Sequence, residues 1–439
     1  MVLSLSPSDG PLKAVFPPSS NSSAISSLSN AHNGGRESIT IATKPEISES
    51  QREPLQRSIS RPITVQRVIS KADQQAFLRM PWAVYKDDSS WAAPIWSEHV
   101  HYFDPAFNAE LKHVDFQAFI ARRGDDAVGS VIAHINRQYN AYHHERIGWF
   151  GQFEVLDDQA VAHQLLGAAE VWLKERGANK VMGPATFSSN SEWGLLIKGY
   201  EHPQMVMTTH AKPYYKNFVE SYGFCKAMDL YSWYYNLIEQ PRLPAQINRI
   251  AQRLKNHGDY RIYNPQKKHW QCESTKALEI FSQAWADNWG FVPFNADEQR
   301  QLSSKLKPII DLDLVVMIEK EGRPIAFAAP LLDVFQPMRR ARMKPGEFGW
   351  WQMLRLLWQW KVRKYASSLR VMLMGVVKEF RGRGLDALMY HEIFEAARRK
   401  GYEHVEMSWI LESNTMMNRA TERVGSELYK IHRVYEKAL

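Results

Sequence analysis

Cysteine is scarce in this sequence, which contains two, Cys225 and Cys272, among 439 residues. Neither belongs to a Cys-x-x-Cys pair, and the cysteines and histidines do not have the spacing of a zinc site. A disulfide scaffold, a zinc finger and a thiol redox motif are therefore unsupported, and we predict no metal site. The low cysteine content also fits a reducing cytoplasm.

Long apolar runs are missing as well. No stretch reaches the roughly 18 apolar residues of a transmembrane helix, and the N-terminus lacks the basic patch and hydrophobic core of a secretion signal. We therefore expect a cytoplasmic protein. Residues 1–60 are rich in Ser, Pro, Asn and Gly, a composition that buries too little apolar surface to offset the entropy of ordering. The sequence predicts a disordered tail there.

Aromatic and basic residues, by contrast, are plentiful. The 15 Trp, 18 Tyr and 19 Phe residues predict well-packed cores and an apolar or amphipathic ligand surface. The formal net charge of +8 is compatible with a nucleic acid, a phosphate-bearing ligand or an anionic membrane as partner. Charge alone does not choose among these partners.

After residue 60 one pattern of elements occurs twice: strand, strand, strand, helix, strand, helix. The first block has strands at 116–121, 128–136, 148–155 and 180–182 and helices at 158–176 and 214–221. The second has strands at 314–318, 324–330, 371–377 and 404–409 and helices at 385–400 and 417–424. We predict an α/β (α+β) protein with two tandem domains, residues 61–238 and 239–439, each a mixed central sheet flanked by helices.

A glycine-rich turn joins the predicted strand 371–377 to the predicted helix 385–400. Its sequence is Arg381-Gly-Arg-Gly384. Glycines allow close backbone approach, and the free N–H groups of a helix N-terminus bind phosphate. The turn has neither the dinucleotide-binding nor the P-loop spacing. The turn is therefore either a phosphate site that belongs to neither of those classes or simply a structural turn.

This turn, together with residues 408–414 and 418–420, resembles the GNAT acyltransferases. Their motif Arg/Gln-x-x-Gly-x-Gly/Ala follows the fourth strand, and here its last position is Asp386. The resemblance implies acyl-CoA or an acyl-carrier-protein thioester as co-substrate, with no permanently bound cofactor. In many members a Tyr four residues before the helix-ending Gly protonates the leaving thiolate, but Thr421 stands there. The implied cofactor-binding residues are Gly375, Val376, Val377, Arg381, Gly382, Arg383, Gly384, Leu385, Asp386, Asn414 and Asn418.

Over residues 63–439 the sequence is similar to a bacterial family of tandem-GNAT proteins. The stretches that carry this likeness are 81–85, 151–154, 183–184, 213–215, 286–291 and 381–386. Bacterial ceramide synthases, which move a long acyl chain from a thioester to a sphingoid-base amine, resemble this group. The resemblance implies an acyl-CoA-dependent N-acyltransferase that acts on a sphingoid base or another lipid amine.

The first block lacks a phosphate loop, because the acidic stretch 154–158 stands where one would be and would repel a pyrophosphate. We expect this block to form a wall of the acceptor site instead. The candidate substrate-binding residues are Asn190, Glu192, Tyr214, Asp287, Asn288 and Trp289.

Acyl transfer to an amine needs a base, donors for the oxyanion and a proton for the leaving thiolate. The candidate bases are Glu412 and His210, and the candidate acids are Tyr435 and Tyr215. For His210 a hydrogen-bonded core histidine is the competing interpretation, and for Tyr435 a packed strand residue. A covalent intermediate is not expected, since neither cysteine has an activating neighbour in the sequence.

Residues 338–344 and 348–364 combine Trp, Leu and Met with many Lys and Arg, at near-helical spacing. Such a helix is typical of an interfacial anchor on anionic lipid. It would place the protein peripherally on the inner membrane and favour a long acyl chain or a lipid amine as substrate. The alternative is a helix packed on the sheet with snorkelling basic side chains.

Two other functions stay open from the sequence. The chain is also compatible with a non-catalytic CoA- or lipid-binding module of the same fold, or with a tRNA-dependent aminoacyl transferase. A general nucleic-acid binder has support from charge alone. Acyl turnover distinguishes an enzyme from a binding module.

Overall fold

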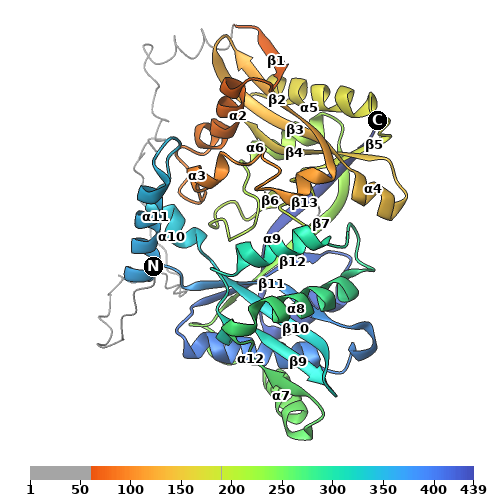
Figure 1. Ribbon diagram of the computed structural model, residues 1–439, viewed down its shortest axis with the longest axis vertical. Helices are drawn as coiled ribbons and strands as arrows, with labels where there is room; N and C mark the ends of the chain where they lie inside the picture. The colour runs from red at the N-terminus through yellow and green to blue at the C-terminus, as the bar shows by residue number, and fades with distance from the viewer. Residues whose placement is uncertain (1–60, 189) are drawn as a thin grey trace, which may run out of the picture. The chain divides into compact units, whose positions relative to one another are not determined.

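The computed structural model describes residues 61–188 and 190–439, all of which belong to one compact unit. The predicted tail, residues 1–60, lies outside the described residues. The two predicted blocks are called here the first half and the second half. They share one mixed sheet of 13 strands, flanked by helices (Figure 1). The predicted α/β class is confirmed.

The first half contains the predicted elements in sequence, with the helix α4 and the strands β6 and β7 among the additional elements. Its main elements are β1 (Ile63–Arg67), α2 (Lys71–Val84), α3 (Trp96–His99), β2 (Val114–Arg123), β3 (Asp126–Asn136), α4 (Arg137–His143), β4 (Ile147–Val155), α5 (Gln159–Lys174), β5 (Lys180–Gly183), β6 (Leu195–Lys198), α6 (Tyr214–Ser221) and β7 (Cys225–Asn236). Buried side chains recur along α5 at Val161, Leu165, Leu166 and Leu173, which is why this helix packs against β2, β3 and β4.

The second half repeats that order and adds helices. Its main elements are α7 (Ala245–His257), β8 (Arg261–Tyr263), α8 (Trp270–Trp285), α9 (Ala296–Leu306), β9 (Val316–Lys320), β10 (Arg323–Leu332), α10 (Phe335–Ala341), α11 (Gly349–Leu357), β11 (Ser368–Val376), α12 (Leu385–Arg399), β12 (His404–Leu411), α13 (Thr415–Val424) and β13 (Glu427–Ala438). The strand predicted at 314–318 begins at Val316 instead, because Leu314 ends a 3-10 turn capped by Asp311.

The two halves exchange their last strands. The sheet order is β1-β2-β3-β4-β5-β13-β7-β12-β11-β10-β9-β8, and the thirteenth strand, β6, pairs with β13 off this path. Thus β13 pairs with β5 of the first half, and β7 pairs with β12 of the second. Tyr435 of β13 consequently lies in the core of the first half, and Trp233 of β7 in that of the second. The predicted domain limit at residue 238 follows β7, a strand that completes the other half's sheet.

Each half contains one pair of parallel strands that diverge. β11 pairs with β12 only from Ser368↔His404 to Val371↔Met407, and β4 pairs with β5 only from Ile147↔Lys180 to Trp149↔Met182. In the first half Ala185 fills the opening: its N–H donates to the Phe150 carbonyl at 2.9 Å. The Ala185 backbone also lies directly against Gly151: a Cβ placed on that glycine would be only 1.9 Å from the Ala185 carbonyl oxygen. The opening in the second half stays a cavity.

Candidate functional site

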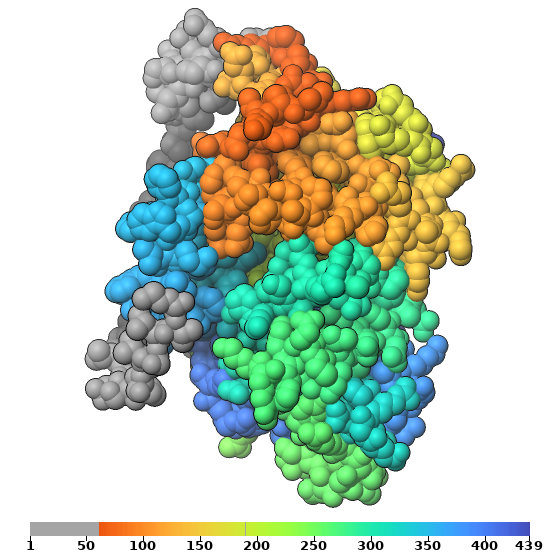
Figure 2. All heavy atoms as spheres, viewed as in Figure 1, coloured from red at the N-terminus to blue at the C-terminus, as the bar shows by residue number. Residues whose placement is uncertain are grey.

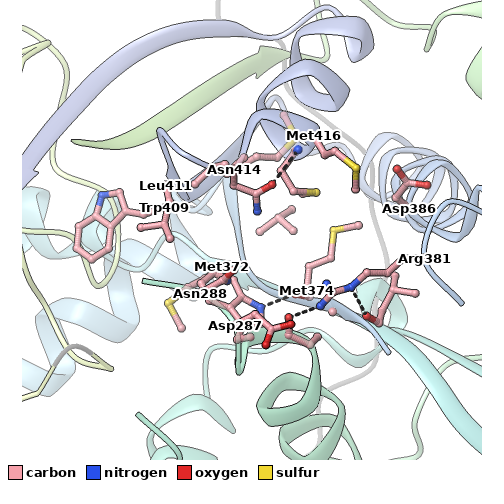
Figure 3. Close-up of a pocket in the computed structure, with 18 of the residues that line it drawn as sticks. Asp287, Asn288, Met372, Met374, Arg381, Asp386, Trp409, Leu411, Asn414 and Met416 are labelled. Atoms are coloured by element: carbon pink, nitrogen blue, oxygen red, sulfur yellow. Dashed lines mark hydrogen bonds between the residues drawn. The ribbon is translucent and has the colours of Figure 1, made fainter. Parts of the chain in front are cut away.

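The cavity, of about 410 Å³, opens where β11 and β12 stop pairing (Figure 3). The end of α8 closes one side and the start of α12 the other, while the start of α13 completes the wall. The strand residues that line the cavity are Val371, Met372, Met374, Gly375 and Val376 of β11 and Met407, Ser408, Trp409, Ile410 and Leu411 of β12. The site is thus a passage between two strands of the sheet.

The turn before α12 shapes one end of this passage. The Arg381 guanidinium donates to the carbonyl oxygens of Val376 at 3.3 Å and Ala284 at 2.5 Å, which fixes it against the cavity wall. Gly382 has a φ of +72°, and no heavy atom lies within 4 Å of the point that a Cβ would occupy there, so its outer face is open. Gly384, with a φ of +82°, is the N-cap of α12. Both glycines occupy the left-handed region that other residues avoid.

No side chain of the described residues caps the N-terminus of α12. Its first-turn N–H groups therefore remain available to a ligand, and the positive end of the helix dipole favours an anion there. The matching helix of the first half differs. Asp158 caps α5, with its carboxylate accepting from the N–H groups of Ala160 at 3.1 Å and Val161 at 3.2 Å. In the first half this position is filled by the chain's own carboxylate.

Most of the predicted cofactor-binding residues surround the cavity. Those that line it are Gly375, Val376, Arg381, Gly382, Leu385, Asp386 and Asn414. Val377, Arg383, Gly384 and Asn418 are not among the lining residues. The Val377 N–H donates to the Ile325 carbonyl at 2.9 Å, and the Arg383 guanidinium sits over the Phe380 ring.

The two predicted asparagines have structural partners. Asn414 caps α13 by accepting from the Met417 N–H at 3.2 Å. The Asn418 amide donates to the Leu411 carbonyl at 2.9 Å, and its oxygen accepts from the Trp233 indole at 3.0 Å. Asn418 therefore ties α13 to β12 and β7, and its predicted contact with the cofactor stays a prediction.

The predicted substrate residues separate into two groups. Asp287, Asn288 and Trp289 line the cavity, whereas Tyr214 donates to the Val155 carbonyl at 3.0 Å within the first half. Asn190 and Glu192 lie on the segment between β5 and β6. The Asn190 amide donates to the Val292 carbonyl at 2.9 Å, so this segment contacts the second half.

The four predicted catalytic residues are not among the residues that line the cavity. Glu412 accepts from the Asp229 N–H at 3.0 Å, and His210 lies 3.1 Å from the Asp88 carboxylate. The hydroxyls of Tyr435 and Tyr215 contact Glu220 at 3.0 Å and Glu154 at 2.9 Å in the first half. Their catalytic roles stay predictions, and the geometry of the cavity adds no support for them.

Sequence reasoning missed Tyr390. This residue of α12 is buried and lines the cavity, yet its hydroxyl has no hydrogen-bond partner among the described residues. Burial raises the pKa of this hydroxyl, so it remains a hydrogen-bond donor at neutral pH. The only signal in the sequence was its place one turn after Asp386 on the helix that follows the glycine-rich turn.

The apolar lining was missed as well. Five methionines face the cavity, namely Met372, Met374, Met407, Met416 and Met417, together with Trp285, Trp289 and Trp409. Methionine side chains are flexible and polarizable, and they adapt to apolar ligands of varied shape. The wall of the cavity is therefore largely apolar and adaptable in shape.

A buried polar cluster lies behind Ser408. The Arg370 guanidinium donates from Nε to Ser408 Oγ at 2.8 Å and from a terminal nitrogen to the Val206 carbonyl at 2.8 Å. Ser408 in turn donates to the Glu406 carboxylate, which also accepts from the Tyr429 hydroxyl. This network fixes the point at which β11 and β12 begin to separate.

Metal clusters and membrane-spanning helices are both missing from the described part of the chain. Within residues 61–188 and 190–439, no group of three or more His, Cys, Asp or Glu side chains is arranged to hold a metal ion. Among the helices described there, none has the length and apolarity needed to cross a membrane.

Comparison with known proteins found two relatives along nearly their whole lengths. The chain is 33% identical over 379 residues to protein YghO of Escherichia coli (strain K12), covering 85% of this chain and 95% of that protein. It is 35% identical over 385 residues to the bacterial ceramide synthase of Caulobacter vibrioides (strain NA1000 / CB15N), covering 86% and 98%. No protein-family model matches the sequence.

Two solved structures are similar to the chain in their fold to different extents. The GCN5-related glucosamine N-acetyltransferase region of a fungal multi-domain GH3 β-N-acetylglucosaminidase has a TM-score of 0.50 at 13% identity, over 86% of this chain and 38% of that chain. A tandem GNAT protein from the clavulanic acid biosynthesis pathway has a TM-score of 0.49 at 10% identity, over 86% of this chain and 98% of that chain. The first of these likenesses is to a GNAT fold.

Proposed function

Because the chain belongs to the tandem GNAT-fold family that includes protein YghO and the bacterial ceramide synthase, we propose that it is an acyl-CoA-dependent N-acyltransferase. The observation that carries this proposal is the passage between β11 and β12, which ends at the uncapped N-terminus of α12. The reaction moves an acyl group from a thioester to an amine.

The start of α12 is the proposed site for the pyrophosphate of CoA. Its free N–H groups and the open face of Gly382 provide an anion site, and Arg381 and Arg383 add positive charge nearby. The contrast with α5, whose N-terminus holds Asp158, supports a single CoA site in the second half. An acyl-carrier protein would present the same pantetheine arm to this passage.

The lining of the passage supports a long acyl chain. Methionine and tryptophan side chains make up much of the wall, and burial of each methylene of a fatty chain against them contributes about 0.8 kcal/mol. An acetyl group would leave most of this apolar surface without a ligand. We therefore propose a long-chain acyl donor.

A lipid amine is the proposed acceptor, with a sphingoid base as the first candidate. The name of the relative from Caulobacter supports this choice. Figure 2 shows a hollow between the orange segment of the first half and the teal segment that contains α9, with the blue segment of α10 and α11 at its edge. An acceptor that enters there lies between the two halves.

Helix α11 and its continuation to Val362 provide a surface for an anionic membrane. Gln352 and Leu356 are buried, whereas Phe348, Trp350, Trp351, Leu354, Leu357, Trp358 and Val362 are exposed. Residues 338–364 contain eight Lys or Arg and one Glu. A helix that packs by one face and exposes aromatic and basic groups on the other has the chemistry of an interfacial anchor. We propose that the protein binds the membrane peripherally through this face.

The proposal is tested by following the release of free CoA thiol from palmitoyl-CoA or acetyl-CoA, with and without sphinganine. We expect release from palmitoyl-CoA that requires the amine, and amide formation in equal amount by mass spectrometry. If no CoA thiol is released from either thioester, the proposal is contradicted.

A matched pair of variants tests the pyrophosphate site. Asn and Asp tolerate the left-handed conformation of Gly382, and the side chain would enter open space. Gly382→Asp adds a negative charge beside the site, so we expect the KM for palmitoyl-CoA to rise roughly five- to tenfold, as about 1 kcal/mol of repulsion requires. Gly382→Asn is isosteric with that variant and neutral, and it should change the KM little. Equal effects of both variants would contradict a pyrophosphate at this position.

One observation favours a second candidate, a CoA- or lipid-binding module without turnover. Thr421 occupies the position of the usual tyrosine acid, and its hydroxyl is buried and donates to the carbonyls of Met417 at 3.0 Å and Asn418 at 2.9 Å. It is therefore not available as a proton donor. Saturable binding of palmitoyl-CoA without thiol release would favour this second function.

A further inference from the structure

A second, smaller cavity lies in the second half, between the sheet and the helices α8 and α9. Its volume is about 40 Å³. Ala277 and Leu278 line it on α8, Leu302 lines it on α9, and Ala329 and Leu373 line it on β10 and β11. Figure 1 shows α8 and α9 in front of this part of the sheet, and α8 contacts both β10 and β11. The second cavity is thus a space beneath the covering helices.

The surface that faces the second cavity is apolar, although a few polar residues border it. These polar groups bond to their neighbours. The Ser303 hydroxyl donates to the Ser274 hydroxyl at 3.0 Å, and Glu273 accepts from the Tyr263 hydroxyl at 2.9 Å. A buried water molecule needs roughly two to four polar partners, which an apolar wall does not offer. An occupant of this cavity should therefore be apolar.

The second cavity begins close to the passage between β11 and β12. Gly375 and Ala284 line the passage, whereas Leu373 and Ala277 line the second cavity. On β11 the two lining residues are two positions apart, which corresponds to about 7 Å. On α8 they are two turns apart, which corresponds to about 10 Å. The same strand and the same helix therefore border both spaces.

The Phe327 ring of β10 stands between the two cavities. It lines the second cavity, and its Cε1 atom lies 3.4 Å from the point that a Cβ on Gly375 would occupy. Gly375 itself has no side chain to close the passage on this side. Because an aromatic side chain can change its rotamer, rotation of the Phe327 ring would join the two cavities.

The order of the lining residues matches the direction that a bound donor would take. Arg381 of the glycine-rich turn donates to the Ala284 carbonyl at 2.5 Å, so this end of α8 lies at the proposed pyrophosphate site. Ala277 lies two turns further away. On β11, which runs towards the turn, Leu373 is likewise further away than Gly375. A donor that enters past α12 therefore meets the passage first and the second cavity after it.

We propose that the second cavity receives the methyl end of the donor's long acyl chain. This role rests on the proposed N-acyltransferase function. The pantetheine arm and the thioester occupy the passage, and the chain continues between α8 and β11 past the Phe327 ring. The second cavity then determines which acyl chain length the enzyme prefers.

A substitution that fills the second cavity tests this role. Ala277→Leu places a larger apolar side chain in it from α8. We expect kcat/KM for palmitoyl-CoA to fall by about tenfold or more, because the last methylenes of the chain lose their burial. The value for octanoyl-CoA should stay within about twofold, since the shorter chain ends before this cavity. Gln271→Leu introduces the same side chain on the exposed face of α8 and is the control.

A second variant approaches the cavity from the sheet. Ala329→Val adds volume from β10, where a β-branched residue suits the strand. It should reduce kcat/KM in the same direction as Ala277→Leu, with a loss that grows from octanoyl-CoA through lauroyl-CoA to palmitoyl-CoA. Thermal unfolding of both variants checks that they fold. A loss of equal size for every chain length would contradict a role of this cavity in chain selection.

A photoreactive donor locates the chain without relying on turnover. Palmitoyl-CoA with a diazirine near its methyl end is irradiated with the full-length protein, and the labelled residues are identified by mass spectrometry. We expect label within residues 270–278 of α8 or 302–306 of α9, and unlabelled palmitoyl-CoA should compete it away. Label confined to residues that line the passage would overturn the proposal.

The outcomes separate this proposal from the proposed function. Amine-dependent turnover together with a wild-type chain-length profile in both Ala277→Leu and Ala329→Val would overturn the role of the second cavity and leave the N-acyltransferase function intact. If the wild type turns over none of the donors, the N-acyltransferase function is overturned, and the position of the photolabel then decides whether the second cavity binds an acyl chain.

Discussion

At the scale of single residues, the hydroxyl of Tyr390 is a hydrogen-bond donor without an acceptor among the described residues. It is buried at the wall of the cavity and has no partner in the described part of the chain. A buried polar group without a hydrogen bond costs about 1–3 kcal/mol. A carbonyl of the pantetheine arm that passes along β11 and β12 would supply the missing acceptor.

Replacement of Tyr390 by Phe tests this contact. Since the hydroxyl has no partner within the described residues, Tyr390→Phe should leave the melting temperature unchanged or raise it slightly. The KM for acyl-CoA should rise roughly five- to tenfold, because one hydrogen bond to the donor of about 1 kcal/mol is lost. A variant with both quantities at wild-type values would show that the hydroxyl does not reach the donor.

The sequence predicted the glycine-rich turn before α12 but not the direction of the other side chains. A glycine-rich turn between a buried strand and a helix is a local feature, so Arg381, Gly382 and Leu385 could be placed from spacing alone. The side chain of Glu412 depends on a distant partner. It bonds the Asp229 N–H of β7, and no pattern near residue 412 shows which strand lies beside it.

At the scale of elements, α11 carries the exposed apolar surface. The exposed fraction is 63% for Trp350 and 56% for Trp358, while Leu356 on the other face is buried. The helix is also tied to the first half, because the Trp96 N–H donates to the Gln352 side chain at 2.9 Å. A membrane bound at α11 would therefore lie next to both halves.

Negative charge placed on this face should release the protein from lipid. We expect the wild type to sediment with vesicles that contain phosphatidylglycerol, and less so as salt rises. The double variant Trp350→Glu, Trp358→Glu should bind at least tenfold more weakly, because each lost ring removes on the order of 1 kcal/mol or more of apolar burial. Val171→Glu, on the exposed face of α5, is the control and should bind as the wild type does. Equal binding by all three proteins would contradict the anchor.

The order of elements was predictable for a physical reason, and the packing of the helices α10 and α11 was not. Apolar and polar side chains alternate along a strand, and apolar side chains recur along α5 and α12 at helical spacing. Both patterns arise because these elements pack on the sheet. The cover formed by α10 and α11 depends on Trp82 and Trp96 of the first half, which lie far away in the sequence. The pattern indicated a helix within residues 348–364 but not the face it would expose.

At the scale of the whole molecule, the exchanged strands make the halves interdependent. β13 supplies Tyr435 to the first-half core, and β7 supplies Trp233 and Tyr235 to the second-half core. Composition and periodicity predicted two similar units, because those properties are local. The pairing of β13 with β5 joins residues more than 200 positions apart, and nothing in the local pattern specifies it.

Separate halves should therefore not fold alone. Residues 61–238 lack β13, and residues 239–439 lack β7, so each fragment leaves an unpaired strand edge and an incomplete core. We expect neither fragment to show a cooperative thermal transition by circular dichroism, whereas the two expressed together should form a complex that melts cooperatively. A sharp transition for residues 61–238 alone would contradict this interdependence.

The place of β13 in the sheet also affects when the first half can fold during translation. Every other strand of the sheet emerges before β13, yet β13 lies between two strands of the first half, β5 and β7. Domains commonly fold in order as they are made. Here the first half has to wait, with the edges of β5 and β7 open to wrong pairing, until residue 427 and its successors are translated. A nascent chain that stalls earlier is thus a client for chaperones and proteases, and translation pauses should be tolerated less well in this protein than in one with two independent domains.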